Sequence, residues 1–121
     1  NVIDPKISVN GRKLYEMKAD RQPVGYQGGV EAPFTRHKVV LNSGDVVYLF
    51  SDGLQDQFGG PKGKKFMKKQ LKELLVEIYE KPMDEQREIL GNTIKSWCSF
   101  IGKNELTLDQ VDDICIIGVR V

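Results

Sequence analysis

Two acidic motifs of the sequence have the residue types of a metal-binding site. Asp52 and Gly53 follow the apolar stretch Val46–Phe50, and Asp112 and Asp113 precede the apolar stretch with which the sequence ends. Hard divalent cations prefer oxygen ligands, and a strand end holds a carboxylate more rigidly than a loop does. Because Gly53 lacks a side chain, the chain can turn sharply away after Asp52. The chemistry to expect is binding of a divalent metal ion.

Each motif also has an ordinary structural explanation. An Asp-Gly pair often ends a strand in a turn, and a solvated loop relieves the repulsion between two adjacent acids. The two motifs together favour a metal site, because each places an acid at one end of an apolar strand. If those strands are antiparallel neighbours, the end of one lies beside the start of the other.

The strands that must position these acids are predicted from their apolar pattern. Val46–Phe50 is apolar on both alternating faces, which is typical of a strand covered on both sides. Ile114–Val121 is mostly apolar and rich in β-branched residues, which predicts a second interior strand. An Asn-Ser-Gly turn predicts that Asp45–Ser51 forms a hairpin with His37–Leu41. The Asn-Gly pair at positions 10 and 11 predicts another hairpin near the start.

Two amphipathic helices are predicted between these strands. From Lys64 to Tyr79 and from Pro82 to Gly102, apolar residues recur at steps of three and four. Pro82 can open the second helix and Gly102 can end it. Hairpins, then two consecutive helices, then one strand predict an α+β fold with both helices packed on a mainly antiparallel sheet.

Composition limits the class of protein. The 121 residues are 40% hydrophobic, which suffices for one compact domain. The 18 basic and 17 acidic residues nearly balance, so we expect neither nucleic acid nor a membrane as a partner of this segment. No apolar run approaches the ~20 residues that cross a bilayer. Cys98 and Cys115 lack the spacing of a zinc site or a disulfide scaffold, so we expect buried, reduced thiols in the cytoplasm.

A lysine cluster opens the first predicted helix. It consists of Lys62, Lys64, Lys65, Lys68 and Lys69. The simplest interpretation is a solvated helix face. Cations at a helix N-terminus oppose the helix dipole, so a surface for a partner or substrate is a second interpretation. A nucleic-acid binder is the third.

The order of these motifs resembles the C-terminal half of a known phosphatase domain. GDVVYLFSDGLQDQFGG, followed by two helices and then DQVDDICIIGVRV, is similar to the SpoIIE/RsbU branch of the PPM family. That family comprises metal-dependent serine/threonine protein phosphatases of the protein phosphatase 2C type. The similarity extends from Lys13 to Val121. It implies a partial PPM-type β-sandwich, with residues 1–121 as the C-terminal portion of a single catalytic domain whose N-terminal part is absent.

The resemblance implies a role for each acidic residue. In the family, the acid of the Asp-Gly motif and the first acid of the final motif bind a pair of Mn²⁺ or Mg²⁺ ions, which implies these roles for Asp52 and Asp112. Asp56 resembles a position that can hold a weaker third ion. Gly53 would form the adjacent turn, and Asp113 would support the ligands from behind. Two ions suit phosphomonoester hydrolysis, because they lower the pKa of a bridging water and neutralise charge on the phosphoryl oxygens. No further catalytic residue is implied.

One motif of the family is missing from the sequence, namely a strand Asp followed by a Gly-His-Gly-type turn. Two or three carboxylates cannot complete the shells of two ions, so we expect this fragment to be unoccupied by metal and inactive. A partial sandwich also exposes sheet edges and an apolar face, which favours self-association.

The leading hypothesis is a bacterial signalling phosphatase that hydrolyses phosphoserine or phosphothreonine by a metal-activated water. Its expected partners are a phosphorylated protein and N-terminal sensory or regulatory domains in the same chain. Segments upstream could anchor the full-length protein in a membrane. The alternative is a non-catalytic interaction or regulatory module on the same scaffold, and the upstream sequence decides between the two.

Overall fold

The computed structural model describes residues 7–9, 11–20, 25, 33–99, 110 and 112–121. The chain divides into two compact units, Asn1–Leu41 and Asn42–Val121. The prediction that residues 1–121 belong to one domain stays a prediction.

The first unit contains the hairpin expected from the Asn-Gly pair. Strands β1 (Ile7–Val9) and β2 (Arg12–Leu14) are antiparallel, with Val9 opposite Arg12. Gly11 has a φ of 76°, the left-handed conformation that such a tight turn requires. The second strand begins directly after the turn, at Arg12.

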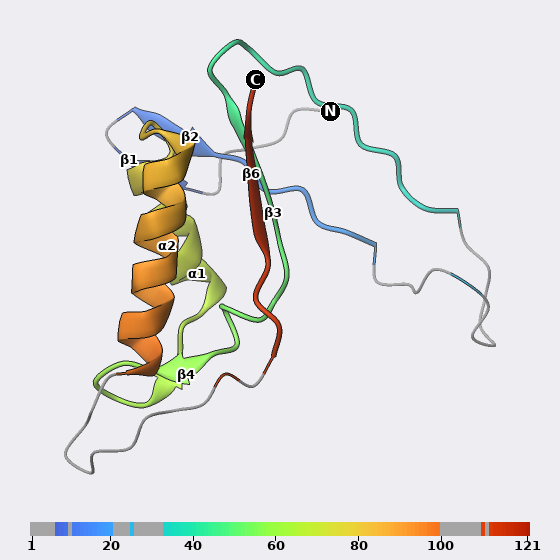
Figure 1. Cartoon of the computed structure of the whole chain (residues 1–121). Coiled ribbons are helices and arrows are strands. Elements are labelled where there is room, and N and C mark those ends of the chain that lie inside the picture. The colour runs from blue at the N-terminus through green and yellow to red at the C-terminus, as the bar shows by residue number, and fades with distance from the viewer. Residues whose placement is uncertain (1–6, 10, 21–24, 26–32, 100–109, 111) are drawn as a thin grey trace. The chain divides into compact units, whose positions relative to one another are not determined.

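The second unit contains all the other elements. In chain order they are β3 (Val46–Phe50), β4 (Phe58–Gly59), β5 (Lys64–Lys65), α1 (Lys68–Ile78), α2 (Met83–Cys98) and β6 (Ile116–Arg120). Among the described residues the strands form two-stranded antiparallel sheets, and in this unit these are β3 with β6 and β4 with β5. The prediction of an α+β fold with two consecutive helices is confirmed (Figure 1).

Strand β3 pairs with β6 over its whole length, from Val46 opposite Arg120 to Phe50 opposite Ile116. The predicted hairpin partner, His37–Leu41, forms no strand. The turn before β3 does exist, since the Asn42 N–H donates to the Asp45 carboxylate at 2.8 Å. The Asn-Ser-Gly sequence therefore predicted the turn correctly, but the predicted partner strand was wrong. The longer apolar stretch near the end of the sequence pairs with β3 instead.

Both helices have the predicted amphipathic faces but different ends. Helix α1 begins at Lys68 rather than Lys64, because Lys64–Lys65 forms β5 and Met67 adopts a left-handed φ of 73°. Pro82 precedes the first residue of α2, as predicted. Gly102, the expected helix stop, lies outside the described residues.

The core of the second unit lies around α1. Its fully buried apolar side chains include Leu54, Phe66, Leu71, Leu75 and Ile78. Burying each of these side chains stabilises the folded state by about 1.5–3 kcal/mol. This packing holds α1 in place although its N-terminus has no side-chain cap.

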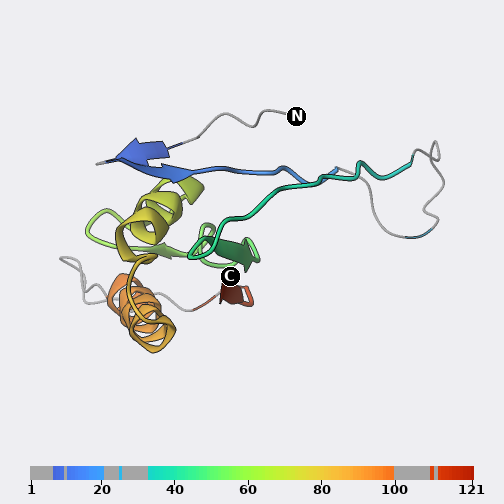
Figure 2. The ribbon, with the colours of Figure 1, turned by 90° about the horizontal axis from the view of Figure 1, so that it is seen from above.

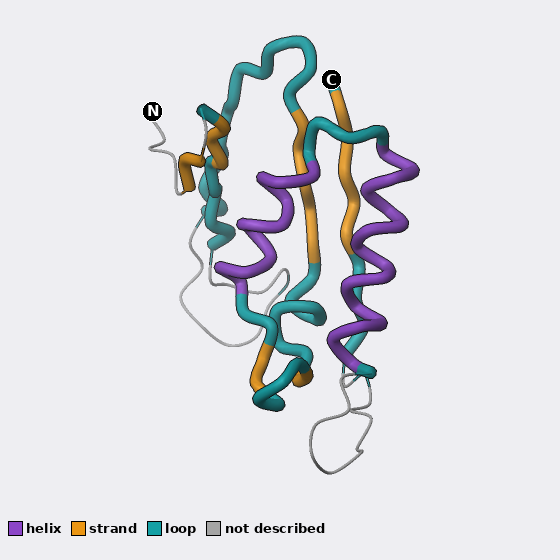
Figure 3. The backbone as a smooth tube through the Cα atoms, turned by 90° about the vertical axis from the view of Figure 1, so that its left-hand side faces the viewer, coloured by secondary structure: helices purple, strands orange, loops and turns teal. Residues whose placement is uncertain are grey.

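The helices lie on one side of the β3–β6 pair, as Figures 1 and 2 both show, and the two long strands run side by side in Figure 3. The opposite face of the pair is open: Leu49 is 63% exposed, and Ile117 and Val119 are each 51% exposed. The expectation that these strands are covered on both sides is therefore wrong for the described residues. The prediction failed because a strand whose apolar face is uncovered has the same sequence pattern as a strand whose apolar face is covered.

A polar network joins α2 to the helix-facing side of the sheet. The Tyr48 hydroxyl donates to Oε1 of Gln86, which is only 2% exposed, and the Gln86 amide donates to the carbonyls of Tyr79 and Lys81 at 3.0 and 2.8 Å. The Arg120 guanidinium donates to the same two carbonyls at 2.7 Å. Burial raises the pKa of Tyr48 to about 12, and the nearby Arg120 charge opposes that rise.

This network predicts a pH-dependent stability. Because burial favours the neutral phenol, the folded state keeps the Tyr48 proton at pH values where the unfolded chain releases it. That stabilisation is complete below about pH 10, the ordinary pKa, and is lost as the pH rises toward 12. Tyr48→Phe should cost about 1–3 kcal/mol at pH 7, because the buried Gln86 oxygen loses its donor, and should flatten the alkaline loss. Urea unfolding at pH 8 and pH 11 checks this, with the exposed Tyr15→Phe as control.

The two cysteines differ from the expectation in their burial. Cys98 and Cys115 are free thiols, but Cys115 is exposed and Cys98 only half-buried, so the expectation of two buried thiols is wrong. Burial raises the pKa of Cys98.

Within the described residues, no helix has the length and apolar character needed to cross a membrane.

Candidate metal centre

The two acidic motifs meet at one end of the β3–β6 pair. Beyond Phe50, the Ser51 N–H donates to the Cys115 carbonyl at 2.9 Å, so the antiparallel ladder continues past the end of both strands. The Ser51 hydroxyl donates to the Asp113 carbonyl and accepts from the Cys115 N–H, both at 3.0 Å. The metal-site prediction required the two apolar strands to be antiparallel neighbours, and they are. The end of β3, next to Asp52, lies beside the start of β6, next to Asp112 and Asp113.

Gly53 is buried at this junction and is in backbone contact with Asp113. A Cβ atom at position 53 would lie 2.0 Å from the Asp113 carbonyl oxygen and 2.7 Å from its carbonyl carbon. Gly53 does not have a left-handed φ. The glycine is needed here for close approach of two backbones rather than for the sharp turn that the sequence suggested.

The carboxylates of Asp52, Asp112 and Asp113 are all exposed at this end. The Asp112 carboxylate accepts from the N–H of Asp113 at 2.8 Å, and the Gln110 side chain donates to the Asp112 carbonyl at 2.9 Å. The Asp52 carbonyl accepts from the Asp56 N–H at 3.0 Å, which closes the turn after β3. Backbone contacts thus fix the chain around each acid and leave its carboxylate open to solvent.

Asp56 occupies a different environment from the other acids. It follows the turn, and its carboxylate lies 3.8 Å from the Lys65 ammonium, with both side chains partly exposed. A cation at Asp56 would have to compete with this lysine. Within the described residues, Asp56 is the one of these acids with a lysine ammonium beside its carboxylate, and its weaker metal role stays a prediction.

The oxygen donors at this end are of the type that a hard divalent ion prefers, but they are too few to complete its coordination shell. Oxygen donors from Asp52 and Asp112 are the ligands that Mg²⁺ and Mn²⁺ prefer. Across the part of the chain that the structure describes, no three acidic, histidine or cysteine side chains lie close enough to hold an ion. Two such ions would need further ligands from outside the described residues.

The loop that follows Asp56 is held in place by packing and hydrogen bonds. Gln57 is fully buried, and its carbonyl accepts from the Phe66 N–H at 2.9 Å and from the Trp97 indole at 2.8 Å. The Trp97 ring packs edge-on against Phe66 at 5.1 Å, and the Gly60 N–H donates to the Trp97 carbonyl at 3.0 Å. The end of α2 is thereby tied to the segment that carries Asp56.

Sequence reasoning missed Ser51 and Gln57 as positioning residues. Each is polar and stands beside an acid of the motif, which is a weak signal by itself. Trp97 is a packing residue, since its ring contacts Phe66 and its indole N–H donates to the Gln57 carbonyl. That Asp52, Asp112 and Asp56 are metal ligands stays a prediction.

The comparisons with known proteins give the class of protein, the PPM type of phosphatase domain, and the acidic strand ends agree with it. The family model described as Stage II sporulation protein E (SpoIIE) matches residues 4–121. The chain belongs to the SpoIIE family.

A solved structure gives independent support for this assignment. The chain is similar to the SiaA-PP2C domain of Pseudomonas aeruginosa, with a TM-score of 0.62 and 29% sequence identity. The match covers 74% of this chain and 34% of that one, so the chain spans about a third of its length. No curated protein sequence matches the chain.

Proposed function

We propose that this chain is the C-terminal part of a catalytic domain that hydrolyses phosphoserine or phosphothreonine in a bacterial signalling protein. The observation that carries the proposal is the antiparallel pairing of β3 and β6, which puts Asp52 and Asp112 at one end of one sheet. Membership of the SpoIIE family and the similarity to the SiaA-PP2C domain support it.

In this proposal, Asp52 and Asp112 bind a pair of Mn²⁺ or Mg²⁺ ions. The ions supply an activated water and offset the charge that develops on the phosphoryl oxygens. Ser51 and Gly53 keep the two strand ends at a fixed separation, so the two carboxylates need little reorganisation on binding. Asp113 supports the ligands, and Asp56 contributes to a third, weaker ion. The remaining ligands come from the rest of the full-length protein, and the isolated chain is inactive.

The partners follow from the same proposal. The substrate is a phosphorylated protein, and sensory or regulatory domains precede the catalytic domain in the same chain. The open face formed by Leu49, Ile117 and Val119 is covered by the rest of the domain in the full-length protein. In the isolated chain this face drives self-association.

A non-catalytic module on the same scaffold is the second candidate. The observation that favours it is the lack of any three-ligand cluster among the described residues. Such a module would bind a regulatory partner without hydrolysing phosphate esters. The two candidates differ in their response to metal.

The full-length protein should hydrolyse p-nitrophenyl phosphate and a phosphoserine peptide only when Mn²⁺ or Mg²⁺ is present. Removal of metal with a chelator should lower the rate by at least about 100-fold, because the water is no longer activated, and Mn²⁺ should restore it. Initial rates with stepwise addition of Mn²⁺ measure this. A phosphatase rate that is unaffected by the chelator would contradict the metal mechanism, and no hydrolysis at any Mn²⁺ concentration would favour the non-catalytic module.

A further inference from the structure

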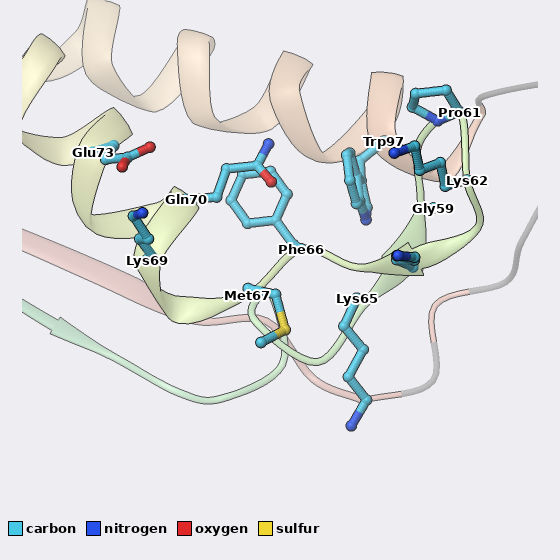
Figure 4. Close-up of a pocket in the computed structure, with 11 residues that line it drawn as sticks. Gly59, Pro61, Lys62, Lys65, Phe66, Met67, Lys69, Gln70, Glu73 and Trp97 are labelled. Atoms are coloured by element: carbon cyan, nitrogen blue, oxygen red, sulfur yellow. The ribbon is translucent and has the colours of Figure 1, made fainter.

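A pocket of about 480 Å³ lies between the β4–β5 hairpin, the start of α1 and the end of α2. Its floor is aromatic and apolar. Figure 4 shows Phe66 and Trp97 beside each other in the middle of it, with Met67 next to Phe66. Phe66 is only 2% exposed, whereas Met67 is 58% exposed. The apolar surface that a ligand can reach therefore comes from Pro61, Met67 and the half-buried Trp97.

The rim of this pocket is strongly basic. Four lysines line it, Lys62, Lys64, Lys65 and Lys69, against one acid, Glu73. The lining side chains thus carry a net charge of +3, although the whole chain has a formal charge of only +1. Lys62, Lys64 and Lys69 are exposed. This concentration of like charge attracts an anionic ligand.

Lys65 has local partners, since its ammonium pairs with Asp56 and lies 5.7 Å from the centre of the Phe58 ring. The stability of α1, however, does not explain Lys69 at its first turn. The first turn of α1 contains no acidic residue and its N-terminus has no side-chain cap. Lysines at this end repel the positive end of the helix dipole. Their placement therefore weakens the helix slightly while it strengthens the field over the pocket.

Lys65 connects the pocket to the candidate metal centre. It lines the pocket, and its ammonium lies 3.8 Å from the carboxylate of Asp56. Asp56 is in turn bonded through its N–H to the Asp52 carbonyl at 3.0 Å. The pocket therefore borders the turn that contains Asp52 and Asp56.

We propose that this pocket docks an acidic segment of the phosphoprotein substrate, adjacent in sequence to the phosphorylated residue. The proposal rests on the phosphatase function proposed above. Carboxylates of the segment pair with the lysines, and one apolar side chain contacts Met67 and Trp97. Such pairs at a rim mainly raise the rate and selectivity of encounter. A single-stranded nucleic acid fits less well, because Phe66 is buried and packs edge-on against the half-buried Trp97, so the pair offers no stack of open ring faces to bases.

The test uses the full-length protein and two phosphoserine peptides, one with three acidic residues beside the phosphoserine and one with their amides. Lys64→Glu combined with Lys69→Glu should raise KM for the acidic peptide by about 10-fold and change kcat by less than about twofold. KM for the amide peptide and the rate on p-nitrophenyl phosphate should change by less than about twofold. The control is Lys81→Glu, an exposed lysine beyond the opposite end of α1, which should change none of these values.

Binding without catalysis gives a second readout. Fluorescence anisotropy of a labelled, unphosphorylated acidic peptide should show binding that weakens with salt and is reduced about 10-fold by the double lysine variant. Equal KM values of variant and parent for the acidic peptide would overturn the docking proposal. So would a single-stranded oligonucleotide that binds more tightly than the peptide. Loss of the phosphatase function itself would appear separately, as no hydrolysis of p-nitrophenyl phosphate by the unmodified protein.

Discussion

Replacing Asp52 or Asp112 by asparagine in the full-length protein is expected to lower phosphatase activity by at least about 100-fold. Each substitution keeps the size of the side chain but removes the negative charge that a Mn²⁺ or Mg²⁺ ligand supplies, and the ions neutralise charge in the transition state. Both residues are exposed, so neither variant should lose stability. Initial rates at saturating Mn²⁺ and calorimetric titration of Mn²⁺ measure the two effects separately.

Three neighbouring substitutions serve as comparisons for these variants. Asp113→Asn should cost about 10-fold at most, because its proposed role is to support a ligand. Asp56→Asn should shift the Mn²⁺ requirement more than the maximal rate. Glu88→Gln, an exposed acid on α2, should change nothing. Full activity of both Asp52→Asn and Asp112→Asn would exclude these residues as ligands.

Gly53→Ala is expected to destabilise the chain by at least about 3 kcal/mol. The added methyl group would lie 2.0 Å from the Asp113 carbonyl oxygen, which belongs to a backbone that Ser51 holds through its hydroxyl. Relief of this overlap requires the two strand ends to separate, which breaks the last bonds of the ladder. Urea unfolding monitored by Trp97, the one tryptophan of the 121 residues, measures the change.

Gly91→Ala provides the matched control, since a Cβ atom there meets nothing within 4 Å. Gly91 lies inside α2, so alanine should stabilise the chain by about 0.5–1 kcal/mol through its higher helix propensity. Similar unfolding midpoints for Gly53→Ala and the unmodified chain would mean that the β3 and β6 ends are not in tight contact.

The sequence predicted the elements with strong local signals. The apolar stripes located both helices, Pro82 gave the start of the second, and the Asn-Gly pair gave the first hairpin. Lys64 and Lys65 were assigned to the first helix because lysine suits a solvated helix face. In the structure they form β5, since pairing with Phe58 and Gly59 outweighs a weak propensity.

The pairing of distant strands was harder to predict. A turn signal before β3 favoured the nearby stretch His37–Leu41, and the actual partner lies about seventy residues away. Strand propensity does not identify a partner, because any two apolar strands can form the same ladder. For the candidate metal centre, the acids were found from their positions at strand ends. Ser51 could not be found in this way, because its role depends on the pairing itself.

The contact between Gly53 and Asp113 has a consequence for how sequences of this family diverge. The packing of two backbones requires the glycine, whereas the side chains of Asp52 and Asp112 are exposed and the Asp112 carboxylate accepts a local hydrogen bond from the neighbouring Asp113 N–H. A descendant that lost the enzymatic activity would be free to change both acids and would still keep the glycine. Under the proposed function, position 53 therefore records descent of the scaffold, and positions 52 and 112 record whether selection for metal-dependent chemistry has continued.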